Sequence, residues 1–193
     1  MSSHRISDAI RESVDVKNKI LADEHILETI REIAETCSQA LCQGNKILFC
    51  GNGGSAADAQ HLAAELSGRF YYDRPPLAAE SLTVNTSFLT AVANDYSFDN
   101  VFARMLNATG HQGDVIVGLS TSGNSENVIR AFKAAHEKGI ITVGLTGEKG
   151  GKLDPLSDFI IRVPSSDTPR IQESHIMIGH IICELIEASI FPR

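Results

Sequence analysis

The amino-acid sequence predicts an α/β fold, in which a parallel sheet is covered by helices on both faces. Two observations carry this prediction. Five short apolar segments alternate with longer segments of helical periodicity, and buried parallel strands are typically continuous apolar runs. The 193 residues, of which 42% are hydrophobic and 21% charged, are also enough for a single globular domain without disulfides or metals.

Residues 1–44 have the spacing of helices, because apolar side chains recur at steps of three and four residues. Asp23 and Glu24 interrupt this pattern and predict a bend, and Gly44 suits a left-handed cap at the C-terminal end. The segment carries more apolar surface than one face of a domain needs. We therefore expect residues 1–45 to be a helical segment for oligomerisation, followed by the main unit at 46–193.

Strand and helix patterns alternate from residue 46 onward. Strands are predicted at 46–50, 82–84, 114–119, 140–145 and 159–163. Helices are predicted between and after them, at 55–67, 86–94, 98–109, 126–138 and 169–189. The segment at 71–76 is the one expected surface excursion; a plain loop is the simplest interpretation, and a lid or an interface loop stays open.

Charge and cysteine content exclude several classes of protein. With 17 Lys and Arg against 24 Asp and Glu, the net charge is −7, so a nucleic-acid partner is not expected. The first residues are polar and no apolar run reaches a membrane-spanning length, so we expect a cytoplasmic protein without a membrane partner. The four cysteines lack metal-site spacing and are expected to be reduced thiols in the core, namely Cys37, Cys42, Cys50 and Cys183.

Two strand-to-helix junctions are candidate ligand loops, because ligands of open parallel sheets bind at the carboxyl ends of strands. Residues 120–125 (STSGNS) place four hydroxyls and a glycine before a helix, which makes a cradle for a phosphate anion. A simple N-cap would need only one of these hydroxyls. Residues 51–55 (GNGGS) add a second amide-rich loop, and the pair predicts one phosphorylated ligand between them.

Polar side chains also interrupt two otherwise apolar helices. His61 and Glu65 are four residues apart and share one helix face, whereas Gln172 and His180 are eight apart on the last helix. A solvated pair and a satisfied core histidine are the simpler interpretations. If the two helices meet, the four side chains could together bind a divalent metal.

Three segments resemble the SIS-domain sugar-phosphate isomerases, and most closely the bacterial phosphoheptose isomerases. They are residues 51–61 (GNGGSAADAQH), 120–125 (STSGNS) and 167–173 (DTPRIQE). The likeness extends over essentially the whole chain. It implies a single SIS domain at 46–193 with a five-stranded parallel sheet flanked by helices, and a homotetramer whose active sites lie between subunits.

The resemblance also implies a reaction. Sedoheptulose 7-phosphate would be isomerised through an enediol to D-glycero-D-manno-heptose 7-phosphate, a precursor of the heptoses in the lipopolysaccharide core. Glu65 matches the proposed general base of the family, and His180 matches the partner acid. If Glu65 also ligates a metal, its basicity falls, so we expect the metal to be supportive or regulatory.

Binding roles are implied residue by residue. Phosphate contacts match Ser120, Thr121, Ser122 and Ser125. Other substrate contacts match Asn52, Gly53, Gly54, Ser55, Glu65, Asn94, Asp95 and Gln172. One zinc ion per subunit is implied at His61, Glu65, Gln172 and His180.

Two alternative functions stay open at this point. A relative with the same fold binds the bacterial replication initiator, but it departs from the isomerases at the positions of Glu65 and His180, which are both present here. Other SIS proteins isomerise or sense other sugar phosphates, including arabinose 5-phosphate. Those proteins usually carry a further regulatory or DNA-binding domain, for which this chain has no room.

Overall fold

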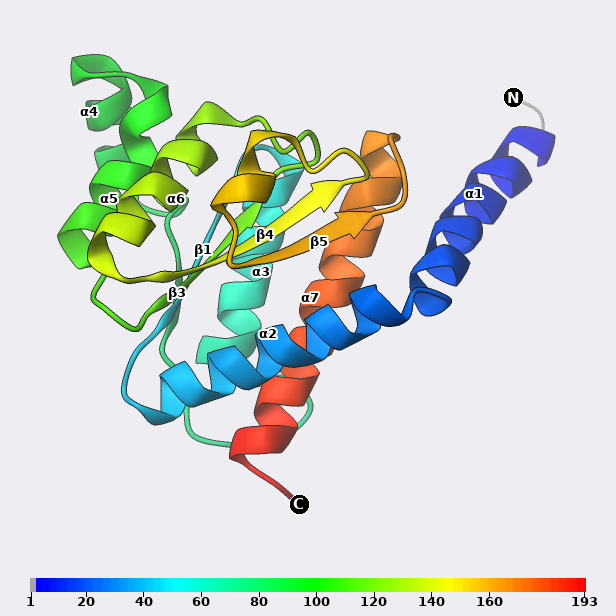
Figure 1. The fold of residues 1–193 in the computed structure, drawn as a ribbon, viewed down its shortest axis with the longest axis horizontal. Coiled ribbons are helices and arrows are strands. Elements are labelled where there is room, and N and C mark those ends of the chain that lie inside the picture. The colour runs from blue at the N-terminus through cyan, green and yellow to red at the C-terminus, as the bar shows by residue number, and fades with distance from the viewer. Residues whose placement is uncertain (1–2) are drawn as a thin grey trace.

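Five parallel strands form one sheet in the computed structural model, which describes residues 3–193 (Figure 1). Their order in space is β2-β1-β3-β4-β5, with the bounds β1 Ile47–Gly51, β2 Ala79–Ser81, β3 Val115–Leu119, β4 Ile141–Gly147 and β5 Phe159–Val163. The predicted parallel sheet is confirmed. β1 and β3 are neighbours in register from Ile47 and Val115 to Gly51 and Leu119, so the loops that follow them leave the same edge of the sheet.

The strand predicted at 82–84 is wrong, because β2 ends at Ser81. Leu82 donates one further backbone hydrogen bond to Phe49 of β1, with N and O 2.9 Å apart, and the chain then turns. Asn85 caps the next helix, α4 (Thr86–Asp95), so no room is left for a strand. Leu82 is fully buried in the turn, and that burial explains why its segment has an apolar pattern like that of a strand.

Helices cover both faces of the sheet, because successive side chains of each strand point to opposite layers. Ile47 and Phe49 of β1 face one layer, and Leu48 and Cys50 face the other. The first layer holds α1 (Ser3–Leu21), α2 (Glu24–Cys42), α3 (Gly54–Ser67) and α7 (Thr168–Ile190). The second holds α4, α5 (Val101–Thr109), α6 (Glu126–Lys138) and the short 3-10 helix η2 (Gly151–Leu156). The helix predicted at 98–109 is divided into a 3-10 turn, η1 (Phe98–Asn100), and α5.

The N-terminal helical segment divides at the predicted bend. Asp23 starts α2 by accepting hydrogen bonds from the backbone N–H groups of His25 and Ile26, at 3.0 and 3.1 Å. Gly44 follows the end of α2 with a φ of 83°, as the cap requires. Residues 1 and 2, the first of the predicted helix, lie outside the described part of the chain.

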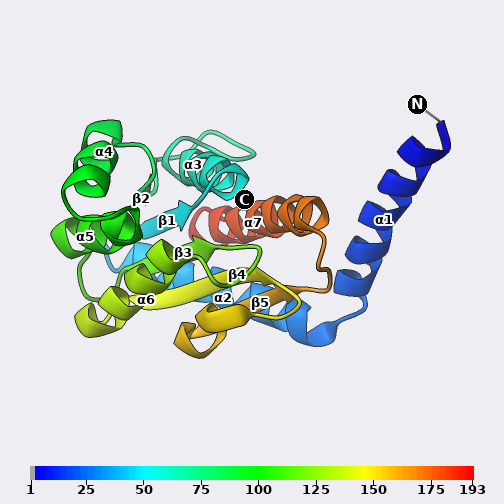
Figure 2. The same cartoon turned by 90° about the horizontal axis from the view of Figure 1, so that it is seen from above.

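One face of α1 is apolar and exposed. Ile6, Ile10 and Val14 recur at four-residue steps and are 64%, 60% and 49% exposed. Val16 and Ile20 pack the end of α1 into the core, and Ser13 hydrogen-bonds to Glu173 of α7. Figure 2 shows the N-terminal part of α1 standing out from the body of the molecule. This stripe is consistent with the oligomerisation expected for the segment, which stays a prediction. No helix within residues 3–193 is long and apolar enough to cross a membrane.

Three of the four cysteines are buried, as expected. Burial raises the pKa of Cys37, Cys50 and Cys183 to about 12 each, which keeps these thiols protonated. The prediction is wrong for Cys42, which is exposed. Cys42 is the last residue of α2, where the helix leaves the core.

The layer between the sheet and α7 contains a fully buried histidine. The Nε2 atom of His175 lies 3.1 Å from the carbonyl oxygen of Thr146 in β4, so Nε2 carries the proton. Its Nδ1 atom has no hydrogen-bond partner among the described residues. Burial lowers the pKa of His175 to about 4, although the bond to Thr146 acts in the opposite direction. The neutral ring therefore ties α7 to the carboxyl end of β4.

We predict that His175 makes the fold sensitive to acid. The ordinary pKa of a histidine is 6.5, and the pKa of His175 in the folded chain is about 4, so the unfolded state binds more protons between these values. The free energy of unfolding should therefore decrease as the pH falls from about 6.5 to about 4, by up to about 3 kcal/mol for this group. Urea unfolding at pH 7 and pH 4 should show a smaller decrease for His175→Gln, whose amide can still donate to Thr146. Equal decreases in both proteins would contradict the prediction.

Candidate active site

The two glycine- and serine-rich loops meet at the carboxyl edge of the sheet. Asn52 lies in the loop between β1 and α3, and Asn127 lies in the first turn of α6, directly after the Ser-rich loop at 120–125. Their side-chain amides exchange two hydrogen bonds, of 2.9 and 2.8 Å. This reciprocal pair holds the loops side by side, as a ligand shared between them would require.

The hydroxyls of the Ser-rich loop do not serve as a simple helix cap. Ser125 stands at the N-cap position of α6, but its side chain makes no capping hydrogen bond. Its Oγ atom instead lies 2.8 Å from that of Ser120. The Oγ atom of Ser122 accepts a 3.1 Å hydrogen bond from the backbone N–H of Asn124 within the same loop. The N-cap interpretation therefore does not account for this cluster of hydroxyls.

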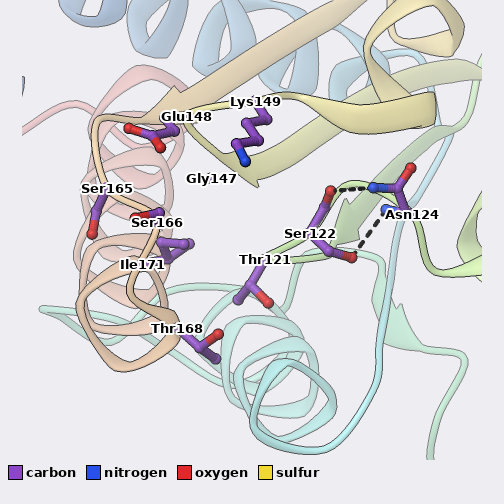
Figure 3. Close-up of a pocket in the computed structure, with 10 residues that line it drawn as sticks. All are labelled: Thr121, Ser122, Asn124, Gly147, Glu148, Lys149, Ser165, Ser166, Thr168 and Ile171. Carbon is purple, nitrogen blue, oxygen red and sulfur yellow. Dashed lines mark hydrogen bonds between the residues drawn. The ribbon is translucent and has the colours of Figure 1, made fainter.

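A hollow of about 250 Å³ opens beside this loop (Figure 3). Ten residues line it, namely Thr121, Ser122, Asn124, Gly147, Glu148, Lys149, Ser165, Ser166, Thr168 and Ile171. The side chain of Lys149 points into the hollow and supplies a cation beside the hydroxyls (Figure 3). Hydroxyl donors with a cation are a suitable lining for a phosphate group. Lys149 is not among the residues predicted from the sequence, although its place just after β4 at the ligand edge was an available signal.

His61, Glu65 and His180 converge where α3 lies against α7. The Nε2 atom of His61 is 2.9 Å from the Nε2 atom of His180 and 3.3 Å from Oε1 of Glu65. One ligand atom of each of the three residues lies within 4.8 Å of the others. The cluster is assembled within a single chain, and we call these three residues the triad.

Two close contacts bring α3 and α7 together. A Cβ atom added to Gly179, the neighbour of His180, would lie 2.5 Å from Cδ1 of the buried Leu62, so only glycine allows this approach. Farther along, a Cβ atom on Gly54 would lie 2.7 Å from Nε2 of Gln172, so the amide of Gln172 touches the start of α3. The condition on which the predicted metal site depends, that the two helices meet, is fulfilled.

The triad fits a divalent metal of the zinc type, since two imidazoles and a carboxylate are common zinc ligands at catalytic sites. One turn before His61, the Oδ2 atom of Asp58 is buried without a hydrogen-bond partner in the described structure. Burial raises the pKa of Asp58, while the neighbouring His61 and His180 act to lower it. A carboxylate beside metal-binding histidines is a usual companion of such a site. Asp58 is not among the site residues predicted from the sequence, because its burial beside His61 and His180 is visible only in the structure.

The remaining predicted substrate contacts are divided between two places. Gly53, Gly54 and Ser55 form the start of α3 next to Asn52, and Ser55 is buried. Asn94 and Asp95 end α4 in the other helical layer, where they are exposed and hydrogen-bond to each other at 2.9 Å. Their contact with a ligand stays a prediction.

We expect Gly123→Ala to weaken phosphate binding. Gly123 has a φ of 65°, and an added Cβ atom would lie 1.9 Å from the carbonyl oxygen of Gly150, so the Ser-rich loop must move. The loss of one charged hydrogen bond to phosphate would lower the affinity by about 10–100-fold. Titration with inorganic phosphate measures this. Gly44→Ala is the matched control, because its φ of 83° carries similar strain with no atom in the way. Equal affinities of the two variants would refute the expectation.

Gly179→Ala should separate α3 from α7. The added methyl group overpacks the contact with Leu62 and should lower the free energy of unfolding by about 1–3 kcal/mol. It should also weaken zinc binding, because His180 moves away from His61. Unfolding by urea and a zinc titration measure both effects. Adding Leu62→Ala makes room for the methyl group, so the double variant should regain zinc affinity; if it does not, this explanation fails.

Comparison with known proteins agrees with this geometry. The SIS domain family matches residues 10–147. The phosphoheptose isomerase of Aneurinibacillus thermoaerophilus is 55% identical over 186 residues, which cover 96% of this chain and 94% of that protein. The phosphoheptose isomerase of Burkholderia pseudomallei (strain K96243) is 50% identical over 188 residues, which cover 97% of this chain and 95% of that protein.

Solved structures show the same relationship. The phosphoheptose isomerase GmhA of Neisseria gonorrhoeae has a TM-score of 0.90 and 46% identity, covering 96% of this chain and 98% of that chain. A phosphoheptose isomerase of Francisella tularensis has a TM-score of 0.92 and 35% identity, with the same coverage of 96% and 98%. The chain therefore belongs to the SIS-domain family and, within it, to the phosphoheptose isomerases, which are sugar-phosphate aldose–ketose isomerases.

Proposed function

We propose that this enzyme converts D-sedoheptulose 7-phosphate into D-glycero-D-manno-heptose 7-phosphate. The single observation that carries the proposal is that α7 contributes both to the hydroxyl-lined hollow, through Thr168 and Ile171, and to the triad, through His180. A linear sugar phosphate is elongated, with its phosphate and its carbonyl at opposite ends. Ile171 at the hollow and His180 in the triad are nine residues, or about 13 Å, apart along the helix, so one elongated ligand can serve both places.

The hollow holds the phosphate end of the substrate in this proposal. Thr121 and Ser122, which line the hollow, would donate hydroxyl hydrogen bonds together with Ser120 and Ser125 of the same loop, and Lys149 would add a positive charge. Binding the distant phosphate orients the reacting carbons and supplies binding energy that the chemistry itself can use. Further contacts to the sugar are assigned to Asn52, Gly53, Gly54, Ser55, Asn94, Asp95 and Gln172.

The triad carries the chemistry. Ketose–aldose isomerisation moves a proton between adjacent carbons through an enediol, which requires a base at those carbons and a proton donor at the carbonyl oxygen. Glu65 is the base and His180 is the acid. Their proximity, through His61, supports this pairing, because both groups can then reach the same end of one ligand.

One zinc ion per subunit would be held by His61, Glu65 and His180, with Gln172 as the fourth expected ligand. When bound, zinc would polarise the carbonyl group and stabilise the negative charge of the enediolate. Glu65 cannot be a strong metal ligand and a strong base at once, because a coordinated oxygen has less basicity. We therefore assign proton transfer to Glu65 and a supporting or regulatory role to the metal.

The active enzyme is a homotetramer with sites between subunits in this proposal. The exposed stripe of Ile6, Ile10 and Val14 on α1 supports a helix-to-helix contact with a second copy. Ile181 and Leu185, which follow His180 on α7, are 36% and 39% exposed and support coverage of the site by another subunit. The N-terminal segment 1–45 would then serve oligomerisation and 46–193 the chemistry. The product would supply the heptoses of the lipopolysaccharide core, and the cytoplasmic location stays a prediction.

The test is turnover of sedoheptulose 7-phosphate, with the product identified by NMR. We expect heptose 7-phosphate from the wild type, and rates lower by about 10²–10⁴-fold for Glu65→Gln and for His180→Gln. Glu137→Gln is the control, since Glu137 is exposed near the end of α6, in the other helical layer from the triad. Full turnover by Glu65→Gln would refute its role as the base.

Two further arms of the same assay address the alternatives. Metal-stripped and zinc-loaded enzyme should differ in rate if zinc supports the reaction, and equal rates would remove it from the proposal. No turnover under any metal condition would favour a different sugar phosphate or binding of the replication initiator. A pull-down with the initiator protein then separates those two.

A further inference from the structure

We propose that the buried Arg74–Glu187 ion pair is a positioning device, which sets how Glu65 on α3 stands relative to His180 on α7. The inference rests on the proposed function, because it treats these two residues as the reacting groups. Arg74 belongs to the segment at 71–76, for which a plain surface loop is the simplest sequence interpretation. Tyr71 is indeed exposed, but the Arg74 and Glu187 side chains are only 2% and 1% exposed.

The guanidinium of Arg74 holds the end of α3. Its Nη2 atom donates a 2.9 Å hydrogen bond to the carbonyl oxygen of Glu65. Its Nη1 atom donates to the carbonyl oxygens of Leu66 and Gly68, at 2.7 and 3.2 Å. The last carbonyls of a helix lack partners within the helix, so Arg74 completes the hydrogen bonding of α3 at the residue that bears the proposed base.

The carboxylate of Glu187 holds the other side. Glu187 lies on α7, seven residues after His180, and accepts a 2.9 Å hydrogen bond from Nε of Arg74. It also accepts hydrogen bonds from the backbone N–H groups of Phe70 and Tyr71, at 3.0 and 2.8 Å. The ring of Phe70 lies 5.8 Å from the ring of His180, between centroids. Glu187 thus fixes the segment that packs against the proposed acid.

These contacts favour positioning over mere stabilisation. A buried ion pair gains little net stability, because removing two charges from water is costly. Here Arg74 hydrogen-bonds the backbone of Glu65, the proposed base on α3. Glu187 hydrogen-bonds the backbone of Phe70, whose ring lies against His180, the proposed acid on α7. Burial acts to raise the pKa of Glu187, but the bonds from Tyr71, Phe70 and Arg74 together lower it, so the pair stays ionised.

Glu187→Gln tests the proposal, and Asp114→Asn is a closely matched control. Asp114 is also 1% exposed, and its carboxylate also accepts two backbone hydrogen bonds, from Lys46 and His111, together with one cation, Lys46. It precedes β3, at the edge of the sheet opposite the ligand loops. Both variants replace a buried, paired carboxylate by an amide, but only one of them is next to the triad.

For Glu187→Gln we expect zinc affinity and kcat each to fall by about 10–100-fold, as for other residues that orient metal ligands. KM for sedoheptulose 7-phosphate should change little, because the hollow is untouched. Asp114→Asn should lose comparable thermal stability while keeping zinc affinity and kcat. Arg74→Lys keeps the charge but not the fork of donors, so it should show the same losses to a smaller degree. It replaces Glu187→Gln in the test if that variant does not fold.

The outcomes separate this inference from the proposed function. Equal zinc affinity and kcat in Glu187→Gln and Asp114→Asn would overturn the positioning role, even if the wild type isomerises the heptose phosphate. A wild type that binds zinc without turning over this substrate would overturn the proposed function alone, and the loss of zinc affinity in Glu187→Gln would still support the positioning role. If the wild type binds no zinc, kcat alone tests the positioning role. A lower kcat in Glu187→Gln than in Asp114→Asn would support that role, and equal values would overturn it.

Discussion

The close approach of α3 and α7 is the constraint on which the site depends. These helices are distant in the chain, and each carries part of the triad. Gly179 allows the contact by leaving room for Leu62, and Gln172 touches Gly54 at the other end. A site assembled from two helices is only as well placed as the helices themselves. A glycine and a buried ion pair therefore both stabilise this one interface between helices. Gly179 is the neighbour of His180, and Arg74 of the ion pair hydrogen-bonds the backbone of Glu65.

The parallel sheet provides the second half of the site by simple geometry. Because β1 and β3 are neighbours with the same direction, the loops that follow them leave the sheet together. The paired amides of Asn52 and Asn127 then lock one loop to the other. α7 begins beside the hollow and continues to the triad, so a single helix connects phosphate binding with proton transfer. This arrangement suits a reaction in which one end of the substrate is held while the other is transformed.

The sequence was informative wherever a signal is local. The parallel sheet, the bend at Asp23 and the Ser-rich loop follow from periodicity and composition within a few residues. The position of β2 did not, because the apolar character of Leu82 comes from burial in a turn and not from strand pairing. From the sequence, a metal site at His61 and His180 could be predicted only on the condition that their two helices meet. No spacing in the chain indicates whether two helices meet. Asn127 and the Arg74–Glu187 pair were missed for the same reason, because each gains its meaning from a partner far away in the chain. Lys149 was missed although its place just after β4 was a local signal.

The central claim is that Glu65 moves a proton between two carbons of the sugar through an enediol. Isomerisation of sedoheptulose 7-phosphate in D₂O, followed by NMR of the product, tests it most directly. A proton carried by an exchangeable carboxyl group is partly replaced by solvent deuterium, so the account predicts deuterium at C2 of the heptose 7-phosphate formed by the wild type. A product made at full rate without any deuterium at C2 would contradict proton transfer through an exchanging carboxyl group, and with it the role assigned to Glu65.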